Sequence, residues 1–349
     1  YKEKDVVERL LGLAENQTQD GDFRHSCALA VGQLGQIEKA VEILLGLAED
    51  QTQDGDLRRK CAEAVGKLGH KDKAVEILLE LTEDQRQSVY LRRGYAYAVG
   101  QLGHKEKDVV ERLLGLAEDQ TQDVYLRCEC ADAVGQLGHK DKAVEILLGL
   151  AEDKTQHVYL RRYCADAVGQ LGHKEKAVEI LLGLAEDQTQ DVDLRHYCAI
   201  TVGQLGHKEK DVVERLLGLA EDQTEFVYLR RECADAVCQL GHKEKAVEIF
   251  LGLAEDQTQD VYLRRYCADA VGQLGHKEKA VEILLGLLGL AEDQTLSVYL
   301  RRECADSLGQ LGHKKKAVDI LVDLYLAQPD KTKDEARFIY DSLWELTVV

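Results

Sequence analysis

The tripeptide Gln-Leu-Gly recurs along this chain at a nearly constant interval. It ends at the following glycines, with a Lys-Leu-Gly variant at the second of them: Gly35, Gly69, Gly103, Gly138, Gly172, Gly206, Gly241, Gly275 and Gly312. Successive copies are 34 or 35 residues apart, except for the last two, which are 37 apart. Self-similarity at this period is the signature of a repeat array, in which each unit packs only against its neighbours. The period therefore excludes an ordinary globular domain.

Each repeat reads as two helices joined by short polar turns. In the copy that begins at Asp260, the apolar residues of the first helix share one face by their spacing: Leu263, Cys267, Ala270, Val271 and Leu274. Gly275 follows, where a left-handed C-terminal cap is favoured. A polar connection over residues 276–279 then leads to a second apolar helix from about Ala280. The sequence predicts an all-α, right-handed α-solenoid of about nine to ten hairpins of 34 residues.

Residues suited to helix N-caps precede the first helix in most copies. They are Asp20, Asp54, Ser88, Asp123, Asp191, Asp260 and Ser297. His157 and Phe226 stand at this position in two copies, and we expect weaker helix starts there.

Two irregularities interrupt the period. Asp5, Asp108 and Asp211 each add one residue before the second helix, where an aspartate is predicted to act as the N-cap. An additional Leu-Leu-Gly within residues 284–290 is predicted to lengthen that helix by nearly a turn and to offset the stack locally.

The repeat pattern ends near the C-terminus. From Leu324 the sequence departs from the period, and a helix is expected from about Lys333 to Leu346. The terminal repeat of a solenoid needs a cap that covers its apolar face. The sequence therefore predicts two parts, a repeat array over residues 1–323 and a C-terminal cap over residues 324–349.

The charge of the chain excludes several classes of partner. Its formal net charge is −19, whereas phosphate binding requires concentrated positive charge, so nucleic acids and anionic membrane surfaces are disfavoured. No apolar run reaches the roughly 18–20 residues of a membrane span. The chain begins inside a repeat and without methionine. We expect it to be part of a larger protein.

Eight of the ten cysteines occupy one repeat position: Cys27, Cys61, Cys130, Cys164, Cys198, Cys233, Cys267 and Cys304. Packed helices lie about 8–10 Å apart, and a disulfide needs Cα atoms closer than about 7 Å. Equivalent cysteines in neighbouring repeats are therefore expected to stay thiols and to be buried as small apolar side chains. Free thiols favour a reducing compartment, so we expect a cytoplasmic location.

The motif Leu-Arg-Arg-x-Cys-Ala-x-Ala-Val-Gly-Gln-Leu-Gly at residues 263–275 resembles the second helix of HEAT-like repeats. The Lys-Ala-Val-Glu-Ile-Leu-Leu that follows resembles the first helix of the next unit. A tetratricopeptide-like repeat is the runner-up, because it has the same length but its Trp, Leu-Gly and Tyr spacing is absent. Near-identical units of this kind are similar to the C-terminal arrays of bacterial, notably cyanobacterial, NACHT-type signalling NTPases. HEAT-like phycobilin lyases are a second resemblance.

These resemblances imply a sensor or partner-recruiting array. In HEAT-like families an Asp and an Arg also form a ladder between neighbouring repeats. The matching arginines are Arg24, Arg58, Arg92, Arg127, Arg161, Arg195, Arg230, Arg264 and Arg301. Their partners by this resemblance are the five N-cap aspartates, so the ladder is expected to be interrupted.

Four positions of the first helix vary most among the copies, and they are Tyr262, Arg265, Tyr266 and Asp269 in the copy that begins at Asp260. Their spacing of i, i+3, i+4 and i+7 places them on one face opposite the core, which we call the variable stripe. The resemblance implies that this helix lines the concave surface of the solenoid. The predicted binding residues on it are Tyr90, Arg93, Tyr97, Tyr125, Tyr159, Arg162, Tyr163, His196, Tyr197, Tyr228, Arg231, Tyr262, Arg265, Tyr266 and Tyr299. Tyr and Arg are enriched in binding hot spots, although exposed positions also drift without a ligand.

Catalytic and metal chemistry have little support in the sequence. Histidine recurs in the loop between the helices, but equivalent loops about 10 Å apart cannot place ligands about 2 Å from one metal ion. No nucleophile, base and orienting group occur together. The sequence predicts a non-catalytic scaffold without cofactor or metal that binds a protein or peptide. The alternatives are a phycobilin lyase-like enzyme and a designed consensus scaffold.

Overall fold

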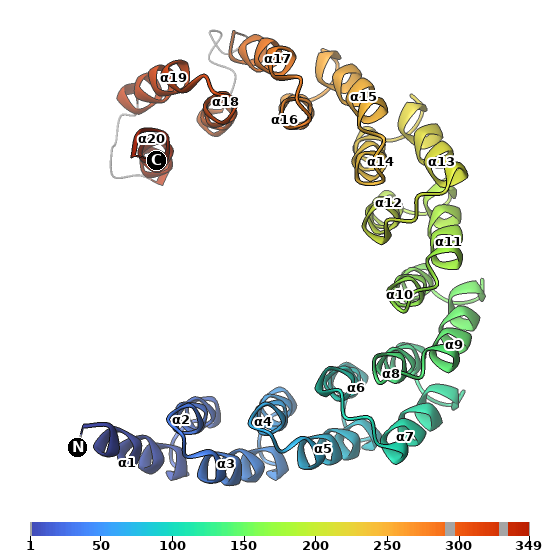
Figure 1. The fold of residues 1–349 in the computed structure, drawn as a ribbon, viewed down its shortest axis with the longest axis vertical. Helices are drawn as coiled ribbons and strands as arrows, with labels where there is room; N and C mark the ends of the chain where they lie inside the picture. The colour runs from blue at the N-terminus through green and yellow to red at the C-terminus, as the bar shows by residue number, and fades with distance from the viewer. Residues whose placement is uncertain (1, 290–296, 328–333, 349) are drawn as a thin grey trace. The chain divides into compact units, whose positions relative to one another are not determined.

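The computed structural model of the chain describes residues 2–289, 297–327 and 334–348. In these residues every regular element is an α-helix, and the helices are α1 to α20 (Figure 1). They form successive antiparallel hairpins, so the all-α solenoid is confirmed. The chain divides into two compact units, residues 1–180 and residues 181–349.

The first unit consists of two layers of helices. Their bounds are α1 (Lys2–Glu15), α2 (Gly21–Gln33), α3 (Ile37–Glu49), α4 (Gly55–Lys67), α5 (Lys71–Glu83), α6 (Val89–Leu102), α7 (Lys107–Glu118), α8 (Val124–Gln136), α9 (Lys140–Glu152) and α10 (Val158–Gln170). The even-numbered helices make one layer and the odd-numbered helices the other (Figure 1). The unit boundary falls within α11 (Lys174–Glu186).

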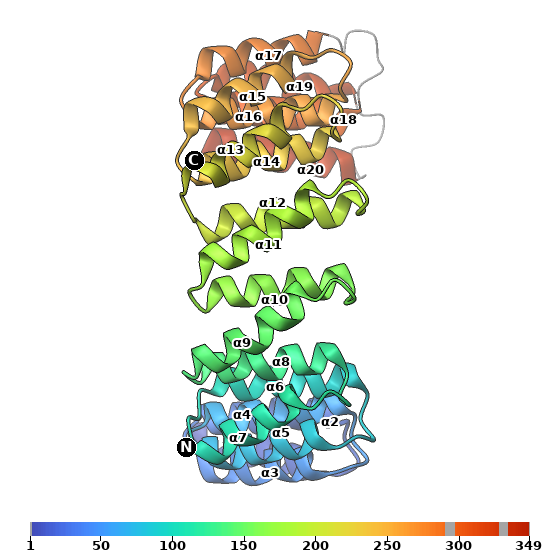
Figure 2. The same cartoon turned by 90° about the vertical axis from the view of Figure 1, so that its right-hand side faces the viewer.

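The second unit repeats this arrangement, and Figure 2 shows the helices of each unit stacked side by side. Its helices are α12 (Val192–Leu205), α13 (Lys210–Glu221), α14 (Val227–Gln239), α15 (Lys243–Glu255), α16 (Val261–Gln273), α17 (Lys277–Gly289), α18 (Val298–Gln310), α19 (Lys314–Ala327) and α20 (Asp334–Val348). The last helix packs on α18 and α19 and buries Ala336 and Ile339. Where the array ends and the C-terminal cap begins stays a prediction.

The predicted N-caps are confirmed at all five aspartates and both serines, whose side chains accept hydrogen bonds from backbone N–H groups of the first turn. Phe226 makes no such bond, as expected. The expectation for His157 was wrong, because its Nδ1 accepts from the Tyr159 N–H at 3.4 Å. An imidazole nitrogen with a free lone pair can replace a carboxylate oxygen at this position.

The predicted glycine caps are also confirmed, since all nine glycines have positive φ. At Gly69, φ is +103° and the following N–H, from His70, bonds back to the Val65 carbonyl at 3.1 Å. The connection after the cap is shorter than predicted. α17 already begins at Lys277, so residues 277–279 form its first turn instead of a loop.

The first of the two irregularities, the additional aspartate, differs from expectation in its N-cap. Asp108 and Asp211 lie inside the first turns of α7 and α13, and the N-cap residues are Glu106 and Glu209, without a side-chain cap bond. The aspartates therefore complement the helix dipole from within the first turn. The structure describes 13 residues of α17, up to Gly289, where the described segment ends, so the predicted lengthening of this helix stays a prediction. The rest of the Leu-Leu-Gly insertion lies outside the described residues.

The core is built from the same positions in each copy. The eight equivalent cysteines are free thiols with at most 5% exposure. The odd-numbered helices contribute leucines such as Leu44, Leu113 and Leu147, all without exposed surface. Small residues on one helix and large ones on the next let the layers interdigitate at the density of a protein interior.

The repeat arginines make a contact that the predicted Asp–Arg ladder did not include. In the described residues the repeat arginine instead donates from Nε to the carbonyl ten residues earlier, as from Arg58 to Ala48 at 2.8 Å. The same bond is made by Arg24, Arg92, Arg127, Arg161, Arg195, Arg230 and Arg264. The acceptors are carbonyls in the last turn of the preceding helix, where intrahelical donors run out. A charge-assisted bond there joins the second helix of one repeat to the first helix of the next.

Candidate functional site

The variable stripe lies on the even-numbered helices, and its predicted binding residues all keep some exposure. The exposed members are Tyr90, Tyr97, Tyr197, Tyr262, Tyr266 and Tyr299. The half-buried members are Arg93, Tyr125, Tyr159, Arg162, Tyr163, His196, Tyr228, Arg231 and Arg265. Tyr90 is the most exposed large apolar side chain of this group, at 74%.

The stripe is not exposed along its whole length. On α8 three of its four positions are held by Cys128, Glu129 and Asp132, which are 0%, 5% and 9% exposed. The expectation that the stripe faces solvent is therefore wrong at this helix. Side chains from the neighbouring helices α6 and α10 cover it, which a single repeat cannot reveal.

Four stripe residues on the neighbouring even-numbered helices α6, α8 and α10 form one cluster. We call it the Arg93 cluster, and its members are Arg93, Tyr125, Glu129 and Tyr163. The Arg93 guanidinium lies 5.1 Å from the Tyr125 ring centroid and 6.0 Å from that of Tyr163. Its Nη2 is 3.7 Å from Oε2 of Glu129, and the Tyr163 hydroxyl donates to the same oxygen at 3.1 Å. Cation–π contacts and a charged hydrogen bond thus tie α6, α8 and α10 together.

A pocket of about 270 Å³ adjoins the Arg93 cluster. Its lining is Asp56, Arg59, Tyr90, Leu91, Arg93, Gly94, Tyr97, Glu129 and Tyr163. Gly94 is the only glycine at the third stripe position, where other copies have Ser, Lys, Glu or Tyr. A Cβ at Gly94 would meet Arg59 Cδ at 3.5 Å, so a longer side chain would fill this space. The pocket is therefore specific to this repeat.

The charges around the pocket are largely neutralised by one another. Arg59 donates to Glu63 at 2.5 Å and lies 3.5 Å from Asp56. Nε of Arg93 is buried, and no described residue accepts a hydrogen bond from it. The Arg93 side chain and the exposed rings of Tyr90 and Tyr97 line the pocket together, a combination of charge and aromatic surface suited to a carbonyl or carboxylate oxygen beside an apolar group.

Burial raises the pKa of Glu129 above its ordinary range, although the Tyr163 hydroxyl and the Arg93 charge oppose the shift. Burial, followed by the charge of Glu129, raises the pKa of Tyr163 as well. Glu129 is thus a carboxyl group that the fold disfavours in its charged form.

We expect the Glu129→Gln variant to change the pH dependence of stability. The folded-state pKa of Glu129 is raised above its unfolded value of about 4.3. The wild-type chain therefore loses stability relative to the variant as pH rises through this window, because the folded state must release a proton that it holds more tightly. Urea unfolding at pH 4.5 and pH 7 measures the difference. A wild-type advantage that grows with pH would contradict the assignment.

In the second unit the stripe forms a ladder of bonds between repeats. The Tyr228 hydroxyl donates to Asp260 at 2.7 Å, and the Tyr266 hydroxyl donates to Asp235 at 3.0 Å. The hydroxyls of Tyr262 and Ser297 are 2.9 Å apart. The hydroxyl groups of these three tyrosines therefore form hydrogen bonds that link neighbouring repeats.

Two arginines of the second unit join the same ladder. The Arg231 guanidinium lies 4.3 Å from the Tyr266 centroid. Arg265 donates to Asp269 at 2.6 Å and lies 3.2 Å from Glu303. These tyrosines and arginines of the stripe also have carboxylate partners, so part of each contact is structural.

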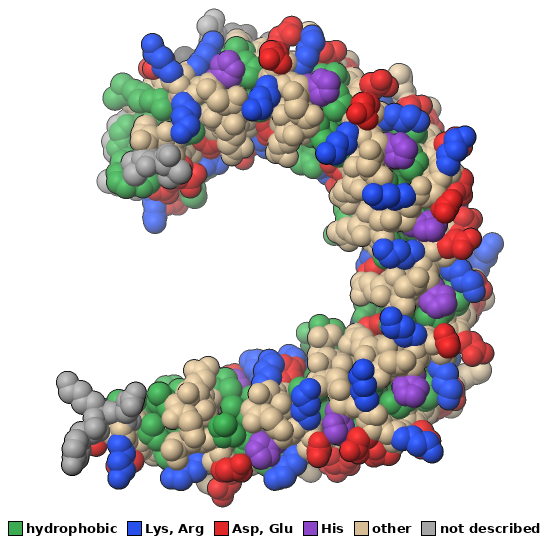
Figure 3. All heavy atoms as spheres, in the orientation of Figure 1, with side chains coloured by type: hydrophobic (Ala, Val, Ile, Leu, Met, Phe, Trp, Pro, Cys, Tyr) green, Lys and Arg blue, Asp and Glu red, His purple; other side chains and the backbone are tan. Residues whose placement is uncertain are grey.

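Histidine does not build a metal centre in the part of the chain that the structure describes. Figure 3 shows histidine side chains set apart from one another along one face of each unit. The described residues hold no group of three or more potential metal ligands. His196, the one stripe histidine proposed for a site, stacks on Phe226 with ring centroids 5.9 Å apart, and burial lowers its pKa. Its ring packs there as a flat aromatic surface.

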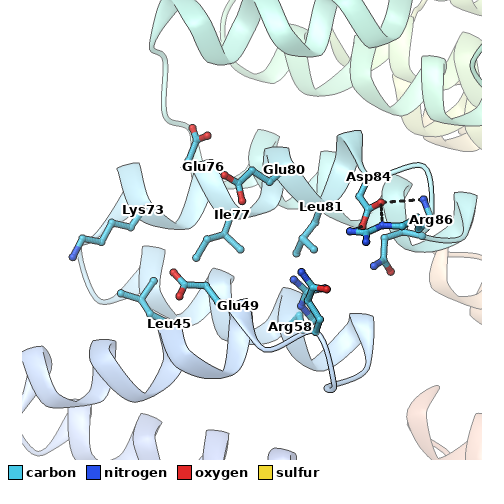
Figure 4. Close-up of a pocket in the computed structure, with 12 residues that line it drawn as sticks. Leu45, Glu49, Arg58, Lys73, Glu76, Ile77, Glu80, Leu81, Asp84 and Arg86 are labelled. Atoms are coloured by element: carbon cyan, nitrogen blue, oxygen red, sulfur yellow. Dashed lines mark hydrogen bonds and ion pairs between the residues drawn. The ribbon is translucent and has the colours of Figure 1, made fainter.

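A larger groove of about 750 Å³ lies between α3 and α5 on the opposite layer, and sequence reasoning missed it (Figure 4). Its floor is apolar, with Leu45, Ile77 and Leu81 between flanking charges. Two hydrogen bonds from Arg86 hold the pKa of Asp84 down to about 2. Four carboxylates and three cationic side chains line the groove, so its charges nearly cancel.

A sequence signal for this groove was present. Glu80, Thr82 and Arg86 replace the Gly, Ala and Thr that stand at these positions in the neighbouring copies. Three replacements in one repeat mark a local departure from the array, but only the structure shows that two of them line one groove.

None of the helices that the structure describes has the length and apolar character needed to cross a membrane.

The chain is similar to known repeat proteins in two of its segments and in its fold. Residues 57–84 and 300–326 match the family model described as PBS lyase HEAT-like repeat. No curated protein matches the sequence. Kap95 in the Kap95:Nup1 complex shares 12% identity with a TM-score of 0.57, covering 99% of this chain and half of Kap95. YibA of Escherichia coli shares 16% identity with a TM-score of 0.50, covering 84% of this chain and 98% of YibA.

At these identities the two structures show the fold alone, and the family model adds the type of repeat in the two matched segments. The chain is an all-α solenoid of tandem helical hairpins, and at least two of its repeats are HEAT-like.

Proposed function

We propose that the chain is a non-catalytic scaffold that binds an extended peptide or a protein segment along the variable stripe. The observation that carries the proposal is the set of exposed tyrosines beside a preformed pocket, above all Tyr90 and Tyr97 next to Arg93. Tyrosine supplies a large contact area at little cost in side-chain entropy, and such rings are frequent hot spots. The scaffold would serve as the sensor or partner-recruiting part of a larger cytoplasmic protein.

Two further observations support this proposal. Kap95, which shares the fold, is seen in complex with Nup1. The free thiols of the core favour a reducing compartment. The absence of cofactor, metal and catalysis is likewise part of the proposal.

The double substitution Tyr90→Ala and Tyr97→Ala is expected to weaken peptide binding about tenfold or more, because each ring flanks the pocket and is mostly free of structural bonds. The probe is a displayed library of random dodecapeptides selected on the wild-type chain, followed by fluorescence titration of the selected peptides. The matched control is Tyr340→Ala, an exposed tyrosine on α20 away from the stripe. Equal affinity of the double variant and the wild type, with unchanged thermal unfolding, would refute the assignment.

A second candidate, a phycobilin lyase-like activity, has its support in the description of the matching family model. It predicts a coloured, covalently attached bilin after incubation of the chain with a free bilin and an acceptor protein. A spectrum without attached pigment would eliminate it.

A further inference from the structure

The second stripe position of one repeat lies beside the conserved cysteine position of the next repeat. The charge of Arg231 acts on the thiol of Cys267 in this way, and the charge of Arg265 acts on that of Cys304. Only on α8 is this stripe position itself a cysteine, Cys128. The residue that faces it from α10 is Cys164.

The two sulfur atoms are in direct contact. Sγ of Cys128 and Sγ of Cys164 are 2.6 Å apart, and neither side chain has exposed surface. That separation is closer to the S–S bond length of about 2.0 Å than to the spacing of about 3.5–4.0 Å between non-bonded carbon atoms. Equivalent cysteines of neighbouring repeats are too far apart to pair, whereas Cys128 and Cys164 occupy different repeat positions.

We propose that Cys128 and Cys164 are an oxidation site that closes to a disulfide and links α8 to α10. The oxidant is a small two-electron peroxide, such as hydrogen peroxide. One sulfur, as thiolate, attacks a peroxide oxygen; the O–O bond breaks, a sulfenic acid forms and water leaves. The second thiolate attacks the sulfenic sulfur and expels hydroxide, which takes up a proton. Two thiols and one peroxide thus give one disulfide and two waters, with two electrons passing from sulfur to oxygen.

The surroundings of Cys128 and Cys164 determine how fast the disulfide forms. Burial raises the pKa of the Cys128 thiol well above its ordinary value, so little thiolate is present at neutral pH. The oxidant must also reach a site without exposed surface. We therefore expect closure over hours and not seconds, with reversal by a thiol reductant.

The chain contains a matched control on the same helix. Cys130 is as buried as Cys128 but occupies the conserved core position. Both residues fall in the tryptic peptide 128–140, whereas Cys164 falls in the peptide 163–174. Substituting one or the other therefore distinguishes a specific pair from general oxidation of buried thiols.

The experiment treats the whole chain with hydrogen peroxide, blocks remaining thiols with iodoacetamide in denaturant, and maps tryptic peptides with and without dithiothreitol. We expect a reducible link between peptides 128–140 and 163–174 in the wild type and in Cys130→Ala, and none in Cys128→Ala. Eight of the ten cysteines should stay alkylatable. Circular dichroism confirms that each variant is folded, and Cys164→Ala serves as a second test of the pair.

Three results would overturn the proposal. The link could persist in Cys128→Ala, the two sulfurs could gain oxygen without joining, or both could remain fully alkylatable after exhaustive treatment of the folded chain.

Discussion

Replacing Arg195 by alanine is expected to lower the free energy of unfolding by about 3–5 kcal/mol, the range found when one partner of a buried ion pair is removed. Arg195 Nε donates to the Ala185 carbonyl at 2.6 Å, and its Nη2 is 2.6 Å from Oε1 of Glu225. Both side chains are about 5% exposed. The substitution leaves a buried carboxylate without a counter-charge and a helix-end carbonyl without its donor.

The control for this prediction is Glu225→Gln. The first unit carries glutamine at the equivalent position, where Gln122 accepts from Arg92 Nη2 at 2.8 Å. A neutral amide can therefore satisfy the same arginine, and we expect a cost of about 1 kcal/mol or less. Urea unfolding followed by circular dichroism compares the two variants. If both variants lost the same free energy of unfolding, the charge of the ion pair would contribute more than the hydrogen bond from Arg195 to the preceding helix.

Phe250→Ala is the second substitution with a large expected effect, about 3–5 kcal/mol. Phe250 lies on α15 with 1% exposure. It is the only phenylalanine at a position where other copies have leucine, such as Leu44 and Leu147. Its removal leaves a cavity between the two layers that close packing cannot fill.

The matched variant is Phe250→Leu, which gives the residue that the other copies use. We expect it to cost less than about 1.5 kcal/mol, because hydrophobic exchanges of similar volume are tolerated when the neighbours can repack. Thermal and urea unfolding measure both variants. If leucine cost as much as alanine, the surroundings of Phe250 would have to differ from those of the leucines in other repeats.

The fold was predictable because every signal needed for it lies within one period. Helix faces, N-cap aspartates and glycine caps each depend on residues fewer than about 15 positions apart, and nine copies repeat them. His157 was misjudged because its capping ability depends on which ring nitrogen holds the proton. The start of α17 at Lys277 was missed because charged residues suit both a loop and the first turn of a helix.

The site was less predictable, because its geometry depends on neighbouring repeats. Variation among copies identified Tyr90, Arg93 and Tyr163 as stripe residues. It could not show that Glu129 is buried beneath them, since its partners come from α6 and α10. Gly94 occupies one of the variable positions, and only the structure shows that its missing side chain leaves the pocket open.

The arginine bond to the preceding helix decides where this array divides into independent parts. Arg58 and its counterparts connect an odd-numbered helix to the even-numbered helix after it, across the turn that contains the N-cap aspartate. A segment excised between two glycine–histidine junctions, such as Gly69-His70 and Gly138-His139, keeps every such bond within it intact. A cut through the turn that contains the N-cap aspartate leaves the arginine on one fragment and its acceptor carbonyl on the other. Shorter or longer variants of the protein should therefore be made by removing or adding segments that begin and end at these glycines.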